Sequence, residues 1–201
     1  MARIALNKSS LQKQSAQIKI YKQYLPSLDL KRKQLIAERS KAAEALKKTQ
    51  GSIEEVRKVV AQNLIMLSNR NVLLKDLATI EDIETGEENL MGIRLPMLKS
   101  VKVTICDYAF MGKPHWVDGV ADNLKIALEL HIKLRIEQQR LKLLDKAVQK
   151  ITQRVNLFDK VLIPKTQENI KRIQIYLSDM EKAAVVRAKI AKRKYQQKKS
   201  L

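Results

Sequence analysis

The chain has 201 residues, and its 40 Lys and Arg against 21 Asp and Glu give a net charge of +19. Five Gly, four Pro and 4% aromatic residues are typical of long helices with charged flanks, and argue against a wide globular core. Cys106 is the single cysteine, which excludes a disulfide within the chain and fits a reducing compartment.

The sequence contains no targeting or membrane-spanning pattern. The start, MARIALNKSS, lacks an apolar core followed by a small-residue cleavage site, so we expect no signal peptide. No stretch approaches the ~18 consecutive apolar residues needed to cross a bilayer. We therefore expect a soluble cytoplasmic protein without direct membrane insertion, able to dock onto something in a membrane.

The charge is distributed unevenly. No acidic residue precedes Asp29 or follows Glu181, whereas six acidic residues crowd positions 76–88. The two acid-free ends hold uncompensated cations: Arg3, Lys8, Lys13, Lys19, Lys22, Lys182, Arg187, Lys189, Lys192, Arg193, Lys194, Lys198 and Lys199.

The first predicted element is one long helix over residues 8–77, with N-cap candidates from Asn7 to Ser10. Apolar residues recur at 3-4 spacing in one register, the pattern of a helix that buries a narrow seam against another helix. At ~1.5 Å per residue this helix would be roughly 100 Å long. Pro26 and Gly51 lie inside the pattern, and because the register continues past both, we expect bends rather than breaks. The seam comprises Leu11, Ile18, Leu25, Leu28, Leu35, Ala42, Leu46, Thr49, Ile53, Val56, Val60, Leu67 and Leu74.

Residues 78–117 are predicted to be a connecting segment with a short β-hairpin. A turn is expected at 84–87, followed by strands at 90–98 and 99–105, the second with alternating β-branched residues. Pro96 is acceptable in an edge strand, and 111–116 reads as loop.

A second long helix is predicted over 118–196, with Asp118 as its N-cap and a basic tail at 197–201. Its 3-4 seam changes register at Pro164, as in a four-residue stutter that locally unwinds a supercoil. The two segments of the seam are Leu144, Val148, Ile151, Val155, Phe158, Leu162, and then Ile170, Ile173, Leu177, Met180, Ala184.

The predicted fold class is mainly α: a long antiparallel two-helix coiled coil with a short β-hairpin at its closed end. If Lys75 faces Gly119, residue i lies opposite about residue 194 − i. Pro26 and Pro164 would then produce one shared bend, and the two cationic ends would lie side by side at the open end.

No catalytic, cofactor or metal site is expected. His115 and His131 lack ligand-spaced partners, Cys106 lacks a nearby base, and no phosphate-binding glycine motif occurs. The sequence therefore favours a protein that is not an enzyme.

The cationic ends allow three interpretations: a solvated face, a nucleic-acid footprint, or insertion into an acidic or polar protein cavity. The apolar residues of the connecting segment are candidates for partner contacts, since a two-stranded hairpin alone covers only part of its surface. The candidates are Met91, Ile93, Leu95, Met97, Tyr108, Phe110 and Trp116.

Three runs resemble the D subunits of V-type (vacuolar and archaeal-type) rotary ATPases. Residues 154–165, RVNLFDKVLIPK, are similar to that family's "RVNALE-x-x-LIP" run before a basic tail. Residues 30–35, LKRKQL, look like its "LK-x-KRD-x-L" segment, and residues 89–96, NLMGIRLP, like its "GV-x-x-P" strand. The resemblance covers nearly the whole chain.

The resemblance implies a central rotor stalk that couples ATP hydrolysis or synthesis to H⁺ or Na⁺ translocation. It implies partners in the catalytic and nucleotide-binding subunits of the hexamer, the small F subunit of the rotor, and a funnel subunit on the membrane ring. Pro26 and Pro164 would bend the stalk, and the connecting segment would meet the ring adaptor or the small rotor subunit. The hexamer cavity would receive Lys8, Lys13, Arg187, Lys189, Lys192 and Arg193.

Two other classes stay open. A prefoldin-like chaperone combines a coiled coil with β-hairpins, but the densely cationic ends argue against apolar client-binding tips. A basic coiled coil that binds nucleic acid would explain the charge directly, although we expect no nucleic-acid partner. Salt-dependent retention of DNA or RNA would favour that class, and co-purification with nucleotide-binding subunits would favour the stalk.

Overall fold

The computed structural model describes residues 5–68, 74, 77–106 and 113–199, with the side chains of all of these except residues 68 and 197–199. The chain divides into two compact units, residues 1–32 with 151–201 and residues 33–150. Two long helical segments account for most of both units, and a two-stranded antiparallel sheet belongs to residues 33–150. The predicted fold class is confirmed.

Helix α1 (Lys8–Asn63) begins at a capping asparagine. The Ser10 amide donates to Oδ1 of Asn7 at 2.7 Å, which satisfies one of the amides left unpaired at a helix start. The predicted seam positions in α1 are buried or half-buried, Leu35 and Thr49 most completely, while most residues between them are exposed. The helix continues through Pro26 without a break.

Helix α1 ends 14 residues before the predicted boundary, at Asn63, and a short 3-10 turn, η1 (Ile65–Ser68), follows. The prediction failed because apolar residues continue past Asn63, where they no longer line a helix. They cover a compact cluster in which Leu77, Val117 and Val120 are buried. The half-buried residues packed on this cluster are Leu64, Leu67, Leu74, Trp116 and Leu124.

The hairpin consists of β1 (Ala78–Leu90) and β2 (Ile93–Ile105), paired antiparallel from Ala78 with Ile105 to Leu90 with Ile93. The prediction of a turn at 84–87 was wrong, and the two predicted strands are one strand, β2. The true turn is Met91-Gly92, with φ of +54° and +88°. Two positive φ values define a type I′ turn, whose twist matches that of the flanking strands.

The acidic segment 81–88 forms a strand because most of its side chains stay in solvent while its backbone pairs with β2. Ser100 donates a hydrogen bond to Glu84 at 2.9 Å across the pair. Gly86 lies within this strand, where an added Cβ would come within 2.8 Å of the Lys99 side chain. Gly86 thus leaves room for the side chain of Lys99 next to an irregularity in the strand register, and it does not form a turn.

Two Gly→Ala substitutions should act in opposite directions. Gly92→Ala should destabilise the protein by about 1 kcal/mol, because a Cβ is disfavoured at positive φ. Gly51→Ala should stabilise it by about 0.5–1 kcal/mol, because Gly51 lies inside α1 with open space around its Cα. Urea unfolding monitored by circular dichroism compares the two, and a stabilising Gly92→Ala would contradict the turn assignment.

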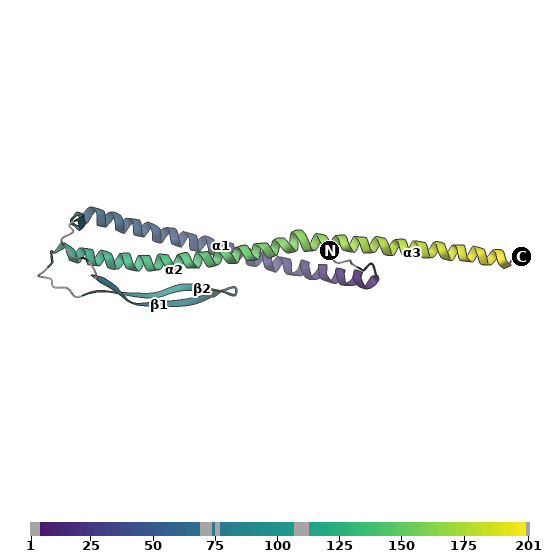
Figure 1. The fold of residues 1–201 in the computed structure, drawn as a ribbon, viewed down its shortest axis with the longest axis horizontal. Helices are drawn as coiled ribbons and strands as arrows, with labels where there is room; N and C mark the ends of the chain where they lie inside the picture. The colour runs from purple at the N-terminus through teal and green to yellow at the C-terminus, as the bar shows by residue number, and fades with distance from the viewer. Residues whose placement is uncertain (1–4, 69–73, 75–76, 107–112, 200–201) are drawn as a thin grey trace. The chain divides into compact units, whose positions relative to one another are not determined.

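The hairpin runs alongside helix α2 (Trp116–Asn156) within residues 33–150, as Figure 1 shows. Its base joins the cluster around Leu77, and Glu88 near its turn pairs with Arg140. The distance from the cluster to the Glu88–Arg140 pair is the same along both elements. It is about 35 Å along α2, from Val117 to Arg140, and about 36 Å along the hairpin, from Leu77 to Glu88. The turn of the hairpin therefore lies beside α2, while its base lies at the closed end, where the hairpin was predicted.

Helix α2 begins two residues before the predicted start and continues into a π-helical segment, η3 (Leu157–Leu162), and then α3 (Ile163–Lys199). The Ile163 amide donates to the carbonyl of Phe158, five residues back. Pro164 has no amide to donate and its ring crowds the preceding turn, which a wider turn relieves. Thr166, which is buried, donates its hydroxyl to the carbonyl of Leu162 at 2.6 Å. The wide turn coincides with the predicted change of register.

Candidate partner-binding surfaces

Neither a metal-binding cluster nor a membrane-spanning helix occurs among the residues that the structure describes. His115 and His131 are exposed, and the half-buried Cys106 lies 3.6 Å from Oγ1 of Thr79.

Contacts between the helices set their register in each unit. In residues 33–150, Arg39 pairs with Asp145, and Leu64 lies beside Gly119. In the other unit the ring of Tyr21 meets that of Phe158 edge to face at 5.5 Å. The predicted register placed Tyr21 opposite residue 173 and Arg39 opposite residue 155, and is wrong by about 10–15 residues. The error arose because α1 was assumed to continue to Leu77.

This register changes the prediction that the cationic ends lie side by side. Since Tyr21 contacts Phe158, Lys8 lies 13 residues earlier, beside about residue 171. Helix α3 continues far beyond that point, to Lys199. By the same register Pro26 lies beside about residue 153, well before Pro164, so the two prolines do not share one height.

The C-terminal extension, residues 178–196, is helical and every one of its side chains is exposed. The last seam residues that α3 buries or half-buries are Ile173 and Leu177. The extension nevertheless carries large apolar residues that are 47–68% exposed: Met180, Val185, Val186, Ile190 and Tyr195. A helix with this composition has no covering partner within the described part of its own chain, which is typical of a surface that another protein covers.

The six cationic candidates are all exposed, but they occupy different places. Lys8 and Lys13 lie in the paired first turns of α1, whereas the other four lie in the C-terminal extension. These four are Arg187, Lys189, Lys192 and Arg193.

The apolar candidates of the connecting segment also differ in exposure and in position. Met91 and Met97 are exposed on the hairpin, and Ile93 is half-buried. Leu95 is completely buried, so it holds the hairpin to its own chain and offers no contact surface. Trp116 packs on the cluster at the other end of the hairpin. Tyr108 and Phe110 lie outside the described residues.

A groove of about 750 Å³ separates residues 96–101 of β2 from α1 and α2, and sequence reasoning did not find it. Its wall on α1 includes the small residues Ala42 and Ala45, and its wall on α2 includes Leu130 and Ile136. Small side chains at two neighbouring positions leave space that a larger residue would fill.

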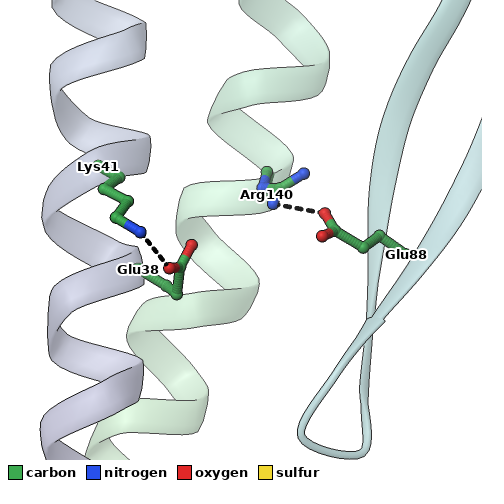
Figure 2. A network of polar contacts seen from close by, with 4 residues as sticks. All are labelled: Glu38, Lys41, Glu88 and Arg140. Carbon is green, nitrogen blue, oxygen red and sulfur yellow. Dashed lines mark hydrogen bonds and ion pairs between the residues drawn. The ribbon is translucent and has the colours of Figure 1, made fainter.

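Charged residues line this groove, among them Glu38, Lys41 and Arg140. Lys41 donates to Glu38 on α1 at 2.7 Å, and Arg140 on α2 donates to Glu88 on the hairpin at 2.7 Å (Figure 2). The hydrogen bond to Glu38, and the negative charge of that carboxylate, raise the pKa of Lys41. Glu88 and Arg140 are 52 positions apart, so only their hydrogen-bonding capacity was visible in the sequence.

Comparison with known proteins gives one consistent result. A family model described as that of the ATP synthase D subunit matches residues 10–193. A protein of Borreliella burgdorferi, named as a V-type ATP synthase D subunit, is 33% identical over 192 residues, covering 96% of this chain and 95% of the relative. A protein of the same name from Chlamydia muridarum is 32% identical over 200 residues, covering 98% of each.

Proposed function

Because this chain belongs to the family of ATP synthase D subunits, we propose that it is the non-catalytic central rotor stalk of a V-type rotary ATPase. It couples ATP hydrolysis or synthesis in a catalytic hexamer to H⁺ or Na⁺ translocation by a membrane ring. Its place is cytoplasmic, peripheral to the membrane through the complex.

The C-terminal extension is the observation that carries this proposal. It is a single helix with exposed apolar residues and a dense set of cations. Apolar side chains supply contact area, and the cations steer the helix towards polar or acidic walls and keep it from adhering. We propose that residues 178–196 enter the central cavity of the hexamer, with Arg187, Lys189, Lys192 and Arg193 facing its wall.

Transmission of torque requires that the remainder of the chain moves with the extension. The seam of α1 supplies side-chain packing in each unit, and the other helical segment contributes the buried residues Leu144, Ile151, Val155 and Ile173. Pro26 and Pro164, in this proposal, bend the stalk at two levels, so that it presents an asymmetric surface to the hexamer.

The other partners are assigned to the remaining candidate residues of the connecting segment. We propose that the small F subunit of the rotor and the funnel subunit of the membrane ring use the hairpin and the cluster around Leu77. Met91, Ile93 and Met97 would serve on the hairpin and Trp116 on the cluster, with Tyr108 and Phe110 as further contacts in the connecting segment. Leu95 is left out because it is buried.

A truncated chain ending at Met180 tests the proposal. It retains every buried seam residue of the described chain, so we expect an unchanged circular dichroism spectrum per residue and a similar midpoint of thermal unfolding. In the reconstituted complex, ATP-driven ion pumping should fall at least about 10-fold, because the contact with the hexamer is lost. Normal pumping by the truncated complex would refute the proposed role of the extension.

A further inference from the structure

The turn end of the hairpin is held to α2 by a partly buried ion pair. Nη2 of Arg140 lies 2.7 Å from Oε2 of Glu88, and the two side chains are 23% and 43% exposed (Figure 2). This geometry gives a charge-assisted hydrogen bond in a site less screened than an open surface. The pair joins α2 to the end of the hairpin that is remote from the cluster around Leu77.

Apolar packing holds this end of the hairpin mainly at Leu95, which lies opposite Glu88 in the sheet and is completely buried. The groove of about 750 Å³ lies between residues 96–101 of β2 and the helices. Most of β1 is exposed, and Leu95 and Val103 are the buried apolar residues of the sheet. Because a two-stranded hairpin is marginally stable alone, its position along α2 depends strongly on the remaining contacts.

Besides Glu88 on the hairpin, a second carboxylate lies within reach of Arg140, that of Glu137 on α2. Glu137 precedes Arg140 by three positions, the spacing at which helical side chains are neighbours, and both residues line the groove. Oε2 of Glu137 is buried and accepts no hydrogen bond from any described residue. A buried carboxylate oxygen without a donor is unfavourable, and the guanidinium one turn away could satisfy it.

We propose that Arg140 is a two-position latch for the hairpin. In the closed state Arg140 binds Glu88 and the Glu137 oxygen is unpaired. In the open state Arg140 turns to Glu137, and the hairpin moves away from α2 at its turn end. Opening exchanges one acceptor for another, so the guanidinium keeps a partner in both states.

The exchange also determines which surface becomes available. Opening exposes the residues of β2 and α2 that face each other across the groove, including Leu98, Val101 and Leu130. The hairpin is thereby a hinged cover whose base stays fixed in the cluster around Leu77. The proposal concerns the isolated chain and does not depend on its role in a complex.

Two substitutions in the purified full-length chain should change hydrogen exchange in opposite directions. Glu88→Gln removes the closed-state pair, so amides of residues 91–100 should exchange about 3–10-fold faster. Glu137→Gln replaces the charged open-state acceptor with a neutral amide, which binds Arg140 less strongly, and removes the unpaired buried charge of the closed state. The same amides should therefore exchange about 2–5-fold slower. Mass spectrometry of peptic fragments measures both.

Glu129→Gln is the matched control, because Glu129 lines the same groove and lies 11 positions from Arg140. It should leave exchange in residues 91–100 unchanged. Combining Glu137→Gln with Arg140→Gln tests the shared partner: in the Arg140→Gln background, Glu137→Gln should have no further effect.

The latch is refuted if Glu88→Gln leaves exchange unchanged, since the ion pair would then not hold the hairpin. It is equally refuted if Glu137→Gln speeds exchange or has no effect. An undiminished effect of Glu137→Gln in the Arg140→Gln background would show that Glu137 acts without Arg140, and would also contradict it. Exchange in α2 peptides 141–150 reports whether a variant is globally destabilised.

Discussion

Leu144→Ala should lower the free energy of unfolding by about 3 kcal/mol, as expected when a buried leucine is truncated and a cavity remains. Leu144 is 0% exposed and occupies the seam that α2 buries. The loss has two parts, the transfer free energy of the deleted methyl and methylene groups and the incomplete collapse of the helices around the space.

Leu143→Ala is the matched control, because Leu143 is the preceding residue on the same helix and 39% exposed. It should cost less than about 1 kcal/mol. Urea titration followed by circular dichroism gives both values. Equal losses for Leu143 and Leu144 would mean that the seam assignment, and with it the packing proposed to carry torque, is incorrect.

Charge reversal in the C-terminal extension should produce the largest effect on assembly. Replacing Arg187, Lys189, Lys192 and Arg193 by Glu should weaken binding to the catalytic hexamer about 100-fold at low salt. These side chains are exposed on an unpaired helix, so the substitutions leave the seam intact. The difference in hexamer affinity between the charge-reversed and the unmodified chain should become smaller at high salt, where the charges are screened.

The control reverses four exposed cations of α1, Lys47, Lys48, Arg57 and Lys58, and changes the net charge by the same amount. Its hexamer affinity should stay within about threefold of the unmodified chain. Surface binding of the purified hexamer at two salt concentrations measures both sets. A similar loss in both sets would assign the effect to net charge and contradict a specific role for the extension.

Helical periodicity was sufficient to predict the parts of the fold that depend on local pattern. The seam from Leu11 to Val60 follows from apolar 3-4 spacing, and the wide turn before Pro164 follows from a change in that spacing plus a residue without an amide. Both signals lie within one element, so no knowledge of the partner helix was required.

The register between the helices depended on where α1 ends, and the sequence has no strong stop signal there. Leu64, Leu67 and Leu74 continue the apolar spacing but pack in a cluster beyond the helix. The hairpin was misread for a related reason: Gly86 carried the turn signal, whereas Met91-Gly92 forms the turn because strand twist selects positive φ. Tertiary packing and pairing override local preference at both places.

The groove and the Glu88–Arg140 pair could not be read from the sequence, because they depend on the path of the hairpin along α2. The two cationic ends of the chain could be predicted from the distribution of charge. That the cations of α1 lie beside another helical segment, whereas those of the C-terminal extension do not, required the register between the helices. Lys8 and Arg187 are similar in the sequence and differ in the structure by what lies beside them.

Rotation of the chain within an assembled ATPase is the most direct test of a stalk function. A bead attached to the hairpin turn of this chain, in a complex whose hexamer is fixed to a surface, should rotate in one direction when ATP is added. It should stop when ATP is removed. A bead that stays still while the same complexes hydrolyse ATP would show that this chain does not turn with catalysis, and would contradict the account.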